Sequence, residues 1–377
     1  MIAAIRSELS VVEPVVYVAF ELGKKSWTLA VTSGMAVTPL VRTVRAGDFA
    51  AVERVIGEAR QRLPVPATAR VMSCYEAGRD GFWIHRALDA RGYANRVVDS
   101  ASIEVNRRAR RRKTDRIDAR KLVTMLVRVS SGERHVWSEV HVPPTAAEAA
   151  RHVSRERTAL TKERTRLTNQ ITSWLATCGC AVSARARRRP DWWTTVRDWA
   201  GAALPATLQA RLARATARLM LVTEQLATID AAQEAARRAA APESAQARLV
   251  QLKGVATTSA AILLEEGLEW RRFQNRRQVG GLLGFTPTPH DSGTVRREQG
   301  ISRAGNSRLQ SVMVELAWGW VHWQPHSALT RWYRERFGSG PRARRIGIVA
   351  LARKLCIALW RWATAGVLPT GAILKAA

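Results

Sequence analysis

The sequence has 377 residues, and its 60 Lys and Arg against 31 Asp and Glu give a formal net charge of +29. The excess amounts to +9, +7 and +13 over residues 1–143, 144–245 and 246–377, which excludes a neutral enzyme with a basic tail. Because an anionic partner relieves this self-repulsion, nucleic acid is the leading class of partner.

Several other classes of protein are excluded by simple features of the chain. No apolar run approaches the roughly 18–20 residues of a membrane span, and the N-terminal MIAAIRSELS has no secretory signal pattern. The cysteines form neither a disulfide framework nor a zinc spacing; they are Cys74, Cys178, Cys180 and Cys356. We therefore expect a reduced, cytoplasmic protein without a membrane partner.

Residues 1–143 predict an α/β domain with a mixed sheet. Apolar runs indicate strands over 15–20, 27–32, 69–75 and 94–98, and helices are expected near 48–62 and 81–91. The first two strands form a hairpin, and the rest alternate strand with helix. The domain is expected to end near Pro143 and Pro144.

Residues 144–245 predict two long helices joined by a break that contains RARRRPDWW. The second helix carries the 4-3 spacing of a coiled-coil seam, with Leu208, Leu212, Ala215, Leu219, Val222, Leu226 and Ile229. Two helices packed within one chain and a coiled coil between subunits both fit this pattern.

Residues 246–377 predict a compact helical domain rich in tryptophan. Ile348, Leu351, Leu355, Leu359 and Trp362 form one apolar helical face. The basic side chains Arg353, Lys354 and Arg361 lie off that face, which indicates a core helix with a basic surface.

Four carboxylates form a candidate metal site in the first domain. Glu21 and Glu76 each follow a predicted strand, and the i,i+3 spacing of Asp115 and Asp118 places both on one face of a helix. Acidic oxygens are the ligands that magnesium prefers, and a two-metal site supports phosphoryl transfer. Salt bridges with neighbouring arginines and lysines explain the same residues equally simply.

Several blocks of the chain closely resemble the transposases of the IS-one-ten family of insertion sequences. They are VAFELGKKSWTLAV, SCYEAGRDGFWIHRAL, VVDSASIEVNRRARRRKTDRIDARKL and QVGGLLGFTPTPHDSGTVRREQGISRAGNSRLQ, in the family's order from about Tyr17 to Trp362. The resemblance implies a RuvC-like (RNase H-like) domain over residues 1–143 with a D-E-D-D metal site. It further implies dimerising coiled-coil helices over 144–245, and a C-terminal transposase domain over 246–377 with a catalytic serine.

The resemblance assigns Mg²⁺ ligands to four positions. Glu76 matches the family's glutamate, and Asp115 and Asp118 match its paired aspartates. Glu21 stands where the usual motif has aspartate, so the extra methylene shifts its oxygens by about 1.5 Å.

The resemblance also assigns the nucleophile to Ser292. From the residues alone, Asp-Ser-Gly predicts only a turn. Basic and polar residues in two segments are expected to bind nucleic acid: Arg107, Arg108, Arg110, Arg111, Arg112 and Lys113 in the first, and Arg296, Arg297, Arg303, Asn306 and Arg308 in the second.

The implied activity is cleavage and rejoining of donor and target DNA through a phosphoserine, guided by a bridge RNA. A dimer, and a tetramer in the synaptic complex, would combine the acidic site of one subunit with the serine of another at the nucleoid. Two alternatives stay open: a metal-only, structure-selective nuclease, and an inactive scaffold that binds nucleic acid.

Overall fold

The fold is described from a computed structural model that covers residues 14–103, 114–292, 295–302 and 305–375, without the side chains of residues 288–299. The chain divides into two compact units, Met1–Val142 and Pro143–Ala377. No helix in the covered ranges is both long enough and apolar enough to cross a membrane.

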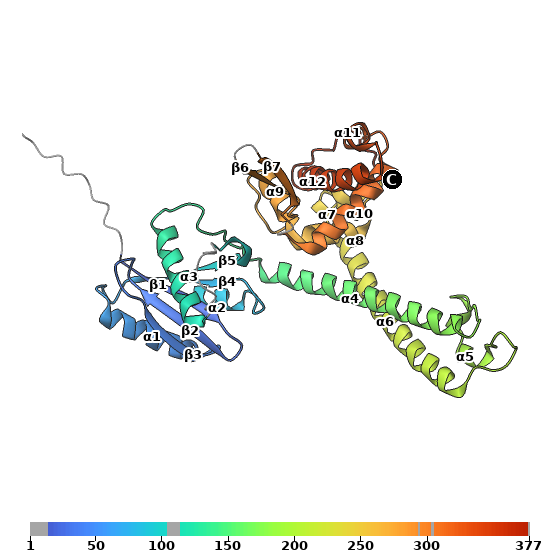
Figure 1. Ribbon diagram of the computed structural model, residues 1–377, viewed down its shortest axis with the longest axis horizontal. Coiled ribbons are helices and arrows are strands. Elements are labelled where there is room, and N and C mark those ends of the chain that lie inside the picture. Colours follow the sequence, from blue (N-terminus) through green and yellow to red (C-terminus); the bar gives the residue numbers. More distant parts are fainter. Residues whose placement is uncertain (1–13, 104–113, 293–294, 303–304, 376–377) are drawn as a thin grey trace, which may run out of the picture. The chain divides into compact units, whose positions relative to one another are not determined.

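A five-stranded mixed sheet forms the centre of the first unit (Figure 1). Its order is β3-β2-β1-β4-β5, with β1 antiparallel to β2 and parallel to β4. The strands are β1 Val15–Leu22, β2 Ser26–Thr32, β3 Leu40–Arg45, β4 Arg70–Glu76 and β5 Ala94–Val98. This arrangement confirms the predicted α/β domain with a mixed sheet.

The two faces of the sheet carry different side chains. Val18, Phe20 and Tyr75 lie on one face, where they pack with apolar residues of α1 (Phe49–Arg62) and α2 (Trp83–Asp89). The opposite face carries Ala19 and Cys74, which pack against α3 (Asp115–Ser130). These short side chains leave room for a helix close to the sheet.

One strand was not expected from the sequence. β3 lies at the edge of the sheet and its side chains are only partly buried or exposed. An edge strand with one neighbour and a sequence of LVRTVR lacks the apolar run by which buried strands are recognised. A short 3₁₀ turn, η1 Ser100–Ser102, follows β5.

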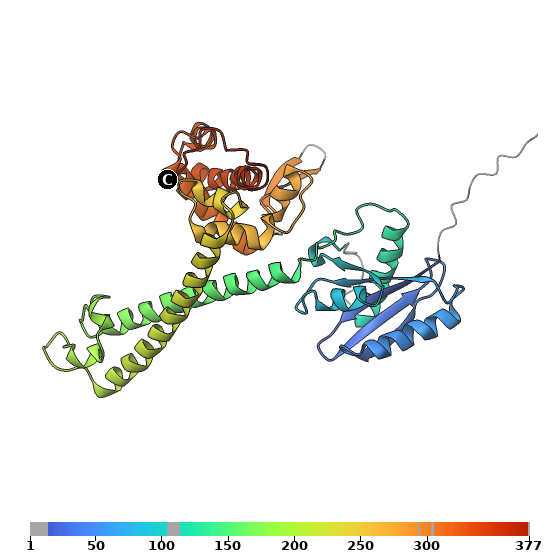
Figure 2. The same cartoon turned by 180° about the vertical axis from the view of Figure 1, so that it is seen from behind.

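The second unit begins with two long helices, α4 (Thr145–Ala176) and α6 (Ala206–Ala239), which pack against each other within the chain. Leu167 is buried with Val222 and Leu226, and Ile171 with Leu212. Figure 2 shows the two helices side by side from behind, joined by a turn that contains η2 Ala186–Arg188 and α5 Trp192–Thr195. The predicted seam therefore packs inside one chain; its use between subunits stays a prediction.

The remainder is mostly helical and surrounds the buried face of α12 (Pro341–Ala365). Ile348, Leu351, Leu355 and Leu359 are all buried there, which confirms the predicted apolar stripe. The other elements are α7 Ala245–Gln251, α8 Thr257–Leu263, the π-helical turn η3 Leu264–Leu268, α9 Arg276–Leu282, β6 Pro287–Ser292, β7 Val295–Ile301, α10 Ser307–Trp323 and α11 Ala328–Phe337.

A purely helical domain was expected over residues 246–377, but the structure contains a β-hairpin as well. β6 and β7 form an antiparallel hairpin in which Ser292 pairs with Val295. The hairpin sequence is mostly polar and contains two prolines, so it lacks the alternating apolar pattern of a half-buried strand.

We predict that Ile171→Ala will lower the free energy of local unfolding of α4 by about 2–5 kcal/mol, because it leaves a cavity between α4 and α6. Ile171 is fully buried in that contact. Native-state hydrogen exchange of the α4 amides measures the change. Met220→Ala on the exposed side of α6 is the matched control and should stay within about 0.5 kcal/mol of wild type. Equal effects of the two substitutions would contradict the packing described.

Candidate active site

Two of the predicted metal ligands lie at the ends of neighbouring parallel strands, Glu21 as the penultimate residue of β1 and Glu76 as the last residue of β4. Phe20 of β1 pairs with Tyr75 of β4, and Glu21 and Glu76 are the next residue of each strand. Two residues earlier, Ala19 and Cys74 pack against α3. Since side chains alternate along a strand, Glu21 and Glu76 belong to the same face of the sheet as α3.

The direction of α3 brings the two aspartates to the same edge. Ser130 Oγ at its end lies 3.0 Å from Met72 Sδ, and the Leu122 carbonyl oxygen lies 3.9 Å from Cys74 Sγ. The helix therefore runs opposite to β4, and its first turn lies toward Glu76. Asp115 and Asp118 are in that first turn.

Helix periodicity places both aspartates on the side of α3 that faces the sheet, where Asp118 is partly buried and Asp115 is exposed. They precede Ala119 and Leu122 by four residues each, and those two residues pack on the sheet. Thr114 caps the helix by accepting a hydrogen bond from the Ile117 amide. Carboxylates in a first turn are also favoured by the helix dipole.

The donor set fits a hard divalent cation, although the side chains are not gathered around one point. Asp118 Oδ2 is buried and makes no hydrogen bond within the described structure, and such an oxygen is satisfied by a cation. All four groups are carboxylates, the ligands that magnesium takes. Among the described residues, no three His, Cys, Asp or Glu side chains are close enough to hold a metal ion.

The predicted nucleophile lies in the other unit, in the β6–β7 hairpin. Backbone pairing places Ser292 opposite Val295, His290 opposite Arg297 and Asp291 opposite Arg296. The side chains of these residues lie outside the described structure, as do the two residues that follow Ser292.

Other predicted nucleic-acid-binding residues also lie outside the described ranges. They are Arg107, Arg108, Arg110, Arg111, Arg112 and Lys113 before α3, and Arg303 after β7.

The remaining two, Asn306 and Arg308, are engaged in contacts inside the second unit. Both donate hydrogen bonds to the fully buried carboxylate of Glu266 in η3, at 2.8 Å and 3.0 Å. Arg155 of α4 binds the same carboxylate through two hydrogen bonds of 3.0 Å. Arg308 also reaches the Ser154 carbonyl oxygen at 2.6 Å, so this cluster joins α4 to η3 and α10. We call these residues the Glu266 cluster.

The Glu266 cluster changes the acidity of its carboxyl group. Burial alone would raise the pKa of Glu266, but the hydrogen bonds from Arg155, Asn306 and Arg308 outweigh it and lower the pKa to about 2. The neighbouring Glu265 has the opposite shift, because burial raises its pKa. Glu266 is therefore ionised at neutral pH, and its buried carboxylate forms ion pairs with Arg155 and Arg308.

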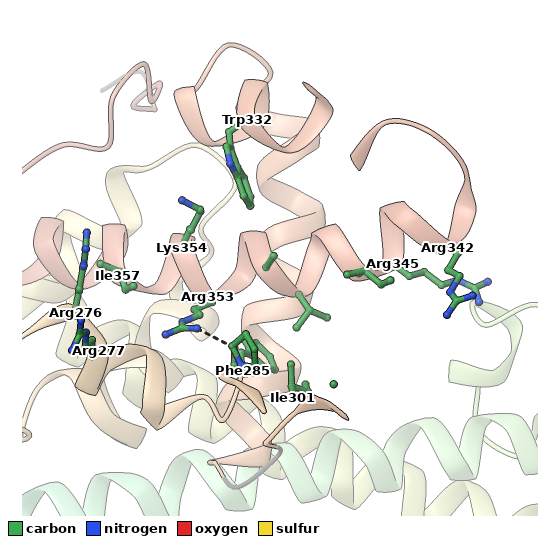
Figure 3. Close-up of a pocket in the computed structure, with 15 residues that line it drawn as sticks. Arg276, Arg277, Phe285, Ile301, Trp332, Arg342, Arg345, Arg353, Lys354 and Ile357 are labelled. Carbon is green, nitrogen blue, oxygen red and sulfur yellow. Dashed lines mark hydrogen bonds between the residues drawn. The ribbon is translucent and has the colours of Figure 1, made fainter. Parts of the chain in front are cut away.

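The second unit contains a basic pocket, shown in Figure 3, that was not predicted from the sequence. It has a volume of about 1100 Å³ and is lined by residues of α9, α11, α12 and the base of the hairpin. Arg353 and Lys354, which the sequence placed on a basic helix surface, belong to it. No pattern in the sequence connects Arg276 and Arg277 of α9, or Trp332 of α11, with α12, because only the fold brings these residues beside that helix.

Comparison with known proteins identifies the class. Residues 246–331 match the family described as "Transposase IS116/IS110/IS902 family", and residues 50–179 match a second family of the IS110 DEDD type, described as "Transposase".

Relatives extend this likeness over the chain. A Sinorhizobium fredii protein named "Putative transposase y4rJ" is 38% identical over 99% of this chain and 96% of its own length. The "Transposase for insertion sequence element IS1328" of Yersinia enterocolitica is 27% identical over 43% of this chain and 47% of its own.

The chain combines a mixed α/β unit, which carries carboxylates at its strand ends, with a mostly helical unit. Together with these comparisons, this architecture identifies a transposase. The chain belongs to the IS110 family of insertion-sequence transposases, whose general activity is the cleavage and rejoining of DNA.

We predict that Glu266→Gln will destabilise the second unit at neutral pH by on the order of 3 kcal/mol and remove part of its acid sensitivity. Since the folded pKa is about 2 and the unfolded value about 4.3, the ionised group stabilises the fold above pH 4.3. That stability is lost as pH falls through about 2. Urea unfolding at several pH values between 2 and 6 measures the effect.

The control for this prediction is Glu156→Gln, an exposed carboxylate on α4. It should leave both the free energy of unfolding and its pH dependence close to wild type. A pH profile that is the same for Glu266→Gln and wild type would contradict the account of the Glu266 cluster.

Proposed function

We propose that this transposase cuts and rejoins DNA through a phosphoserine at Ser292, with a RuvC-like acidic site formed by Glu21, Glu76, Asp115 and Asp118. One observation carries the proposal: strand register and helix direction bring all four acidic positions to one edge and one face of the sheet. Salt bridges with neighbouring basic residues would not require carboxylates from three separate elements, β1, β4 and α3, to converge. The strand order β3-β2-β1-β4-β5 also supports the RuvC-like assignment.

The acidic edge is proposed to hold Mg²⁺. When bound there, the ion supplies positive charge to a DNA phosphate and to the oxygens that enter and leave. Asp118 is the best-supported ligand, because its buried Oδ2 has no hydrogen bond from the described residues. Glu21 is a carboxylate with one more methylene than the family's aspartate, so it reaches further from the end of β1.

Ser292 is proposed to attack a DNA phosphate. Its Oγ forms a bond to phosphorus while the bond to one deoxyribose oxygen breaks; the hydroxyl proton leaves Ser292 and a proton is taken up by the leaving oxygen. One phosphodiester is exchanged for another, so the strand can be resealed without an external energy source. Arg296, Arg297 and Arg303 are proposed to hold the phosphate, because they follow the serine closely in the sequence.

The assembly is proposed to contain RNA as well as DNA. The family resemblance supports a bridge RNA that pairs with donor and target DNA. The net charge of +29 supports binding of more nucleic acid than a single DNA duplex. The composite site is proposed to form in a dimer, or in a tetramer during synapsis. The seam of α6 packs against α4, so an oligomer is supported instead by the apolar side chains of α6 that stay exposed, Met220 and Leu221.

We predict that Ser292→Ala will abolish formation of a covalent protein–DNA adduct. The protein is incubated with Mg²⁺, the element's terminal DNA and its flanking RNA, and the products are separated on a denaturing gel. Wild type should give a slowly migrating, protease-sensitive DNA band, and the alanine variant should give none.

Two outcomes of this assay would favour the alternatives. DNA cut by Ser292→Ala without an adduct would indicate a metal-only nuclease. DNA that is bound equally but never cut, by wild type as well, would indicate an inactive scaffold.

We predict that Asp118→Asn will weaken Mn²⁺ binding by the full chain on the order of tenfold to a hundredfold, because it removes a ligand oxygen. Isothermal titration without nucleic acid measures it, and Mn²⁺ serves as the probe for magnesium. Glu21→Asp restores the family's residue and should bind at least as tightly as wild type.

Glu53→Gln is the matched control for the metal titration. Glu53 is an exposed carboxylate of α1, on the other side of the sheet from α3, and its substitution should not change Mn²⁺ affinity. Equal binding by Asp118→Asn and Glu53→Gln would overturn the assignment of the acidic edge.

A further inference from the structure

The pocket of the second unit gathers six cationic side chains. Arg276 and Arg277 lie at one end of it in Figure 3, and Arg342 and Arg345 at the other, with Arg353 and Lys354 between them. Arg342 and Lys354 are twelve residues apart on α12, which corresponds to about 18 Å along the helix. This length accommodates several phosphates of one strand.

These cations have no carboxylate partner among the side chains that the structure describes. Within the described structure no carboxylate forms an ion pair with any of the six. Five of them, all except Arg353, are exposed. By contrast, the arginines of the long helices are often paired, as Arg157 is with Asp230 at 2.5 Å. A row of unpaired, exposed cations around a concavity is suited to a polyanion.

Part of the pocket is apolar. We call its apolar lining residues Phe285, Ile346, Val349 and Ile357 the floor, and Trp332 also lines the pocket, with the Lys354 ammonium 4.5 Å from its ring centroid. A base pair held in a duplex does not expose its flat face, whereas an unpaired base does. A floor of this kind beside an aromatic ring is suited to unpaired bases, which stack regardless of their identity.

The described side chains that line the pocket offer no hydrogen-bond acceptor to a sugar or a base. None of the described lining residues is Asp, Glu, Asn, Gln, Ser or Thr. The 2′-hydroxyl, the mark that separates RNA from DNA, therefore has no side-chain acceptor here. The Phe285 carbonyl oxygen already accepts a hydrogen bond from Arg353 at 3.5 Å.

We propose that this pocket binds an unpaired stretch of nucleic-acid strand, with its phosphates on the arginines and its bases on the apolar floor, without preference for DNA or RNA. The inference rests on the proposed function in one respect: Pro287, Gly300 and Ile301 at the base of the Ser292 hairpin form one wall. Ser292 is five positions after Pro287 along β6, or about 17 Å, so a strand bound in the pocket can extend to the nucleophile.

The test compares Arg342→Gln/Arg345→Gln with the control Arg331→Gln/Arg361→Gln, which removes two exposed arginines of the same unit outside the pocket. Both are made in the full chain carrying Ser292→Ala and are assayed in a chelator, so that no DNA is cut. Binding is measured by fluorescence anisotropy with oligothymidylate, oligouridylate, a duplex and an abasic strand of equal length. Thermal melting confirms that each variant is folded.

The pocket variant should bind both single strands about tenfold or more weakly, and its slope of log K against log salt should be shallower by about 1.4. The control should behave as wild type. The duplex should lose less affinity than the single strands, and the abasic strand should bind wild type more weakly than oligothymidylate does. Photo-cross-linking of a 5-iodouracil strand should label the α11 peptide that contains Trp332.

The inference is overturned if the pocket variant matches the control, if the duplex loses as much affinity as the single strands, or if the abasic strand binds equally well. Much tighter binding of oligothymidylate than of oligouridylate, or the reverse, overturns the inference that the pocket binds DNA and RNA equally. The Ser292 adduct is assayed separately, with Mg²⁺, in the chain that keeps Ser292. An adduct without single-strand binding by the pocket means that only this inference has failed. Single-strand binding by the pocket without an adduct means that only the proposed function has failed.

Discussion

The buried carboxylate of Glu266 and the arginines around it hold the second unit together. Glu266 is fully buried, and its oxygens accept hydrogen bonds from Arg155 on α4 and from Asn306 and Arg308 at the start of α10. Removing one member of such a cluster leaves a buried charge uncompensated, which typically costs 3–5 kcal/mol. The long helix α4 is thereby fixed to the elements that carry the hairpin and the basic pocket.

This constraint separates two uses of arginine in a chain with a charge of +29. Arg155 and Arg308 are held by Glu266, and Arg218 is held by Glu163 across the helix pair, so their charges serve the fold. Arg342 and Arg345 have no carboxylate partner in the described structure and line a concave surface. Net charge alone suggests nucleic acid of any kind, whereas the distribution of partners indicates where on the second unit it binds.

The first unit could be predicted from its sequence because its buried strands are apolar runs and because strands alternate with helices along the chain. The strands that carry Glu21 and Glu76 near their ends were expected, and their parallel orientation follows from the strand–helix alternation. β3 could not be predicted, because an edge strand buries few of its side chains. In the second unit, the partners of Glu266 lie 40 to 111 residues away, and no local pattern identifies such contacts. The pocket is likewise assembled from residues between Arg276 and Ile357 that only the fold brings together.

The most direct test of the account is mass spectrometry of the protein after reaction with DNA, RNA and Mg²⁺, followed by nuclease digestion. The account predicts a nucleotide on the peptide of the β6–β7 hairpin, with the added mass on Ser292. Recombined DNA without any nucleotide-modified peptide, or a nucleotide on another residue, would contradict it.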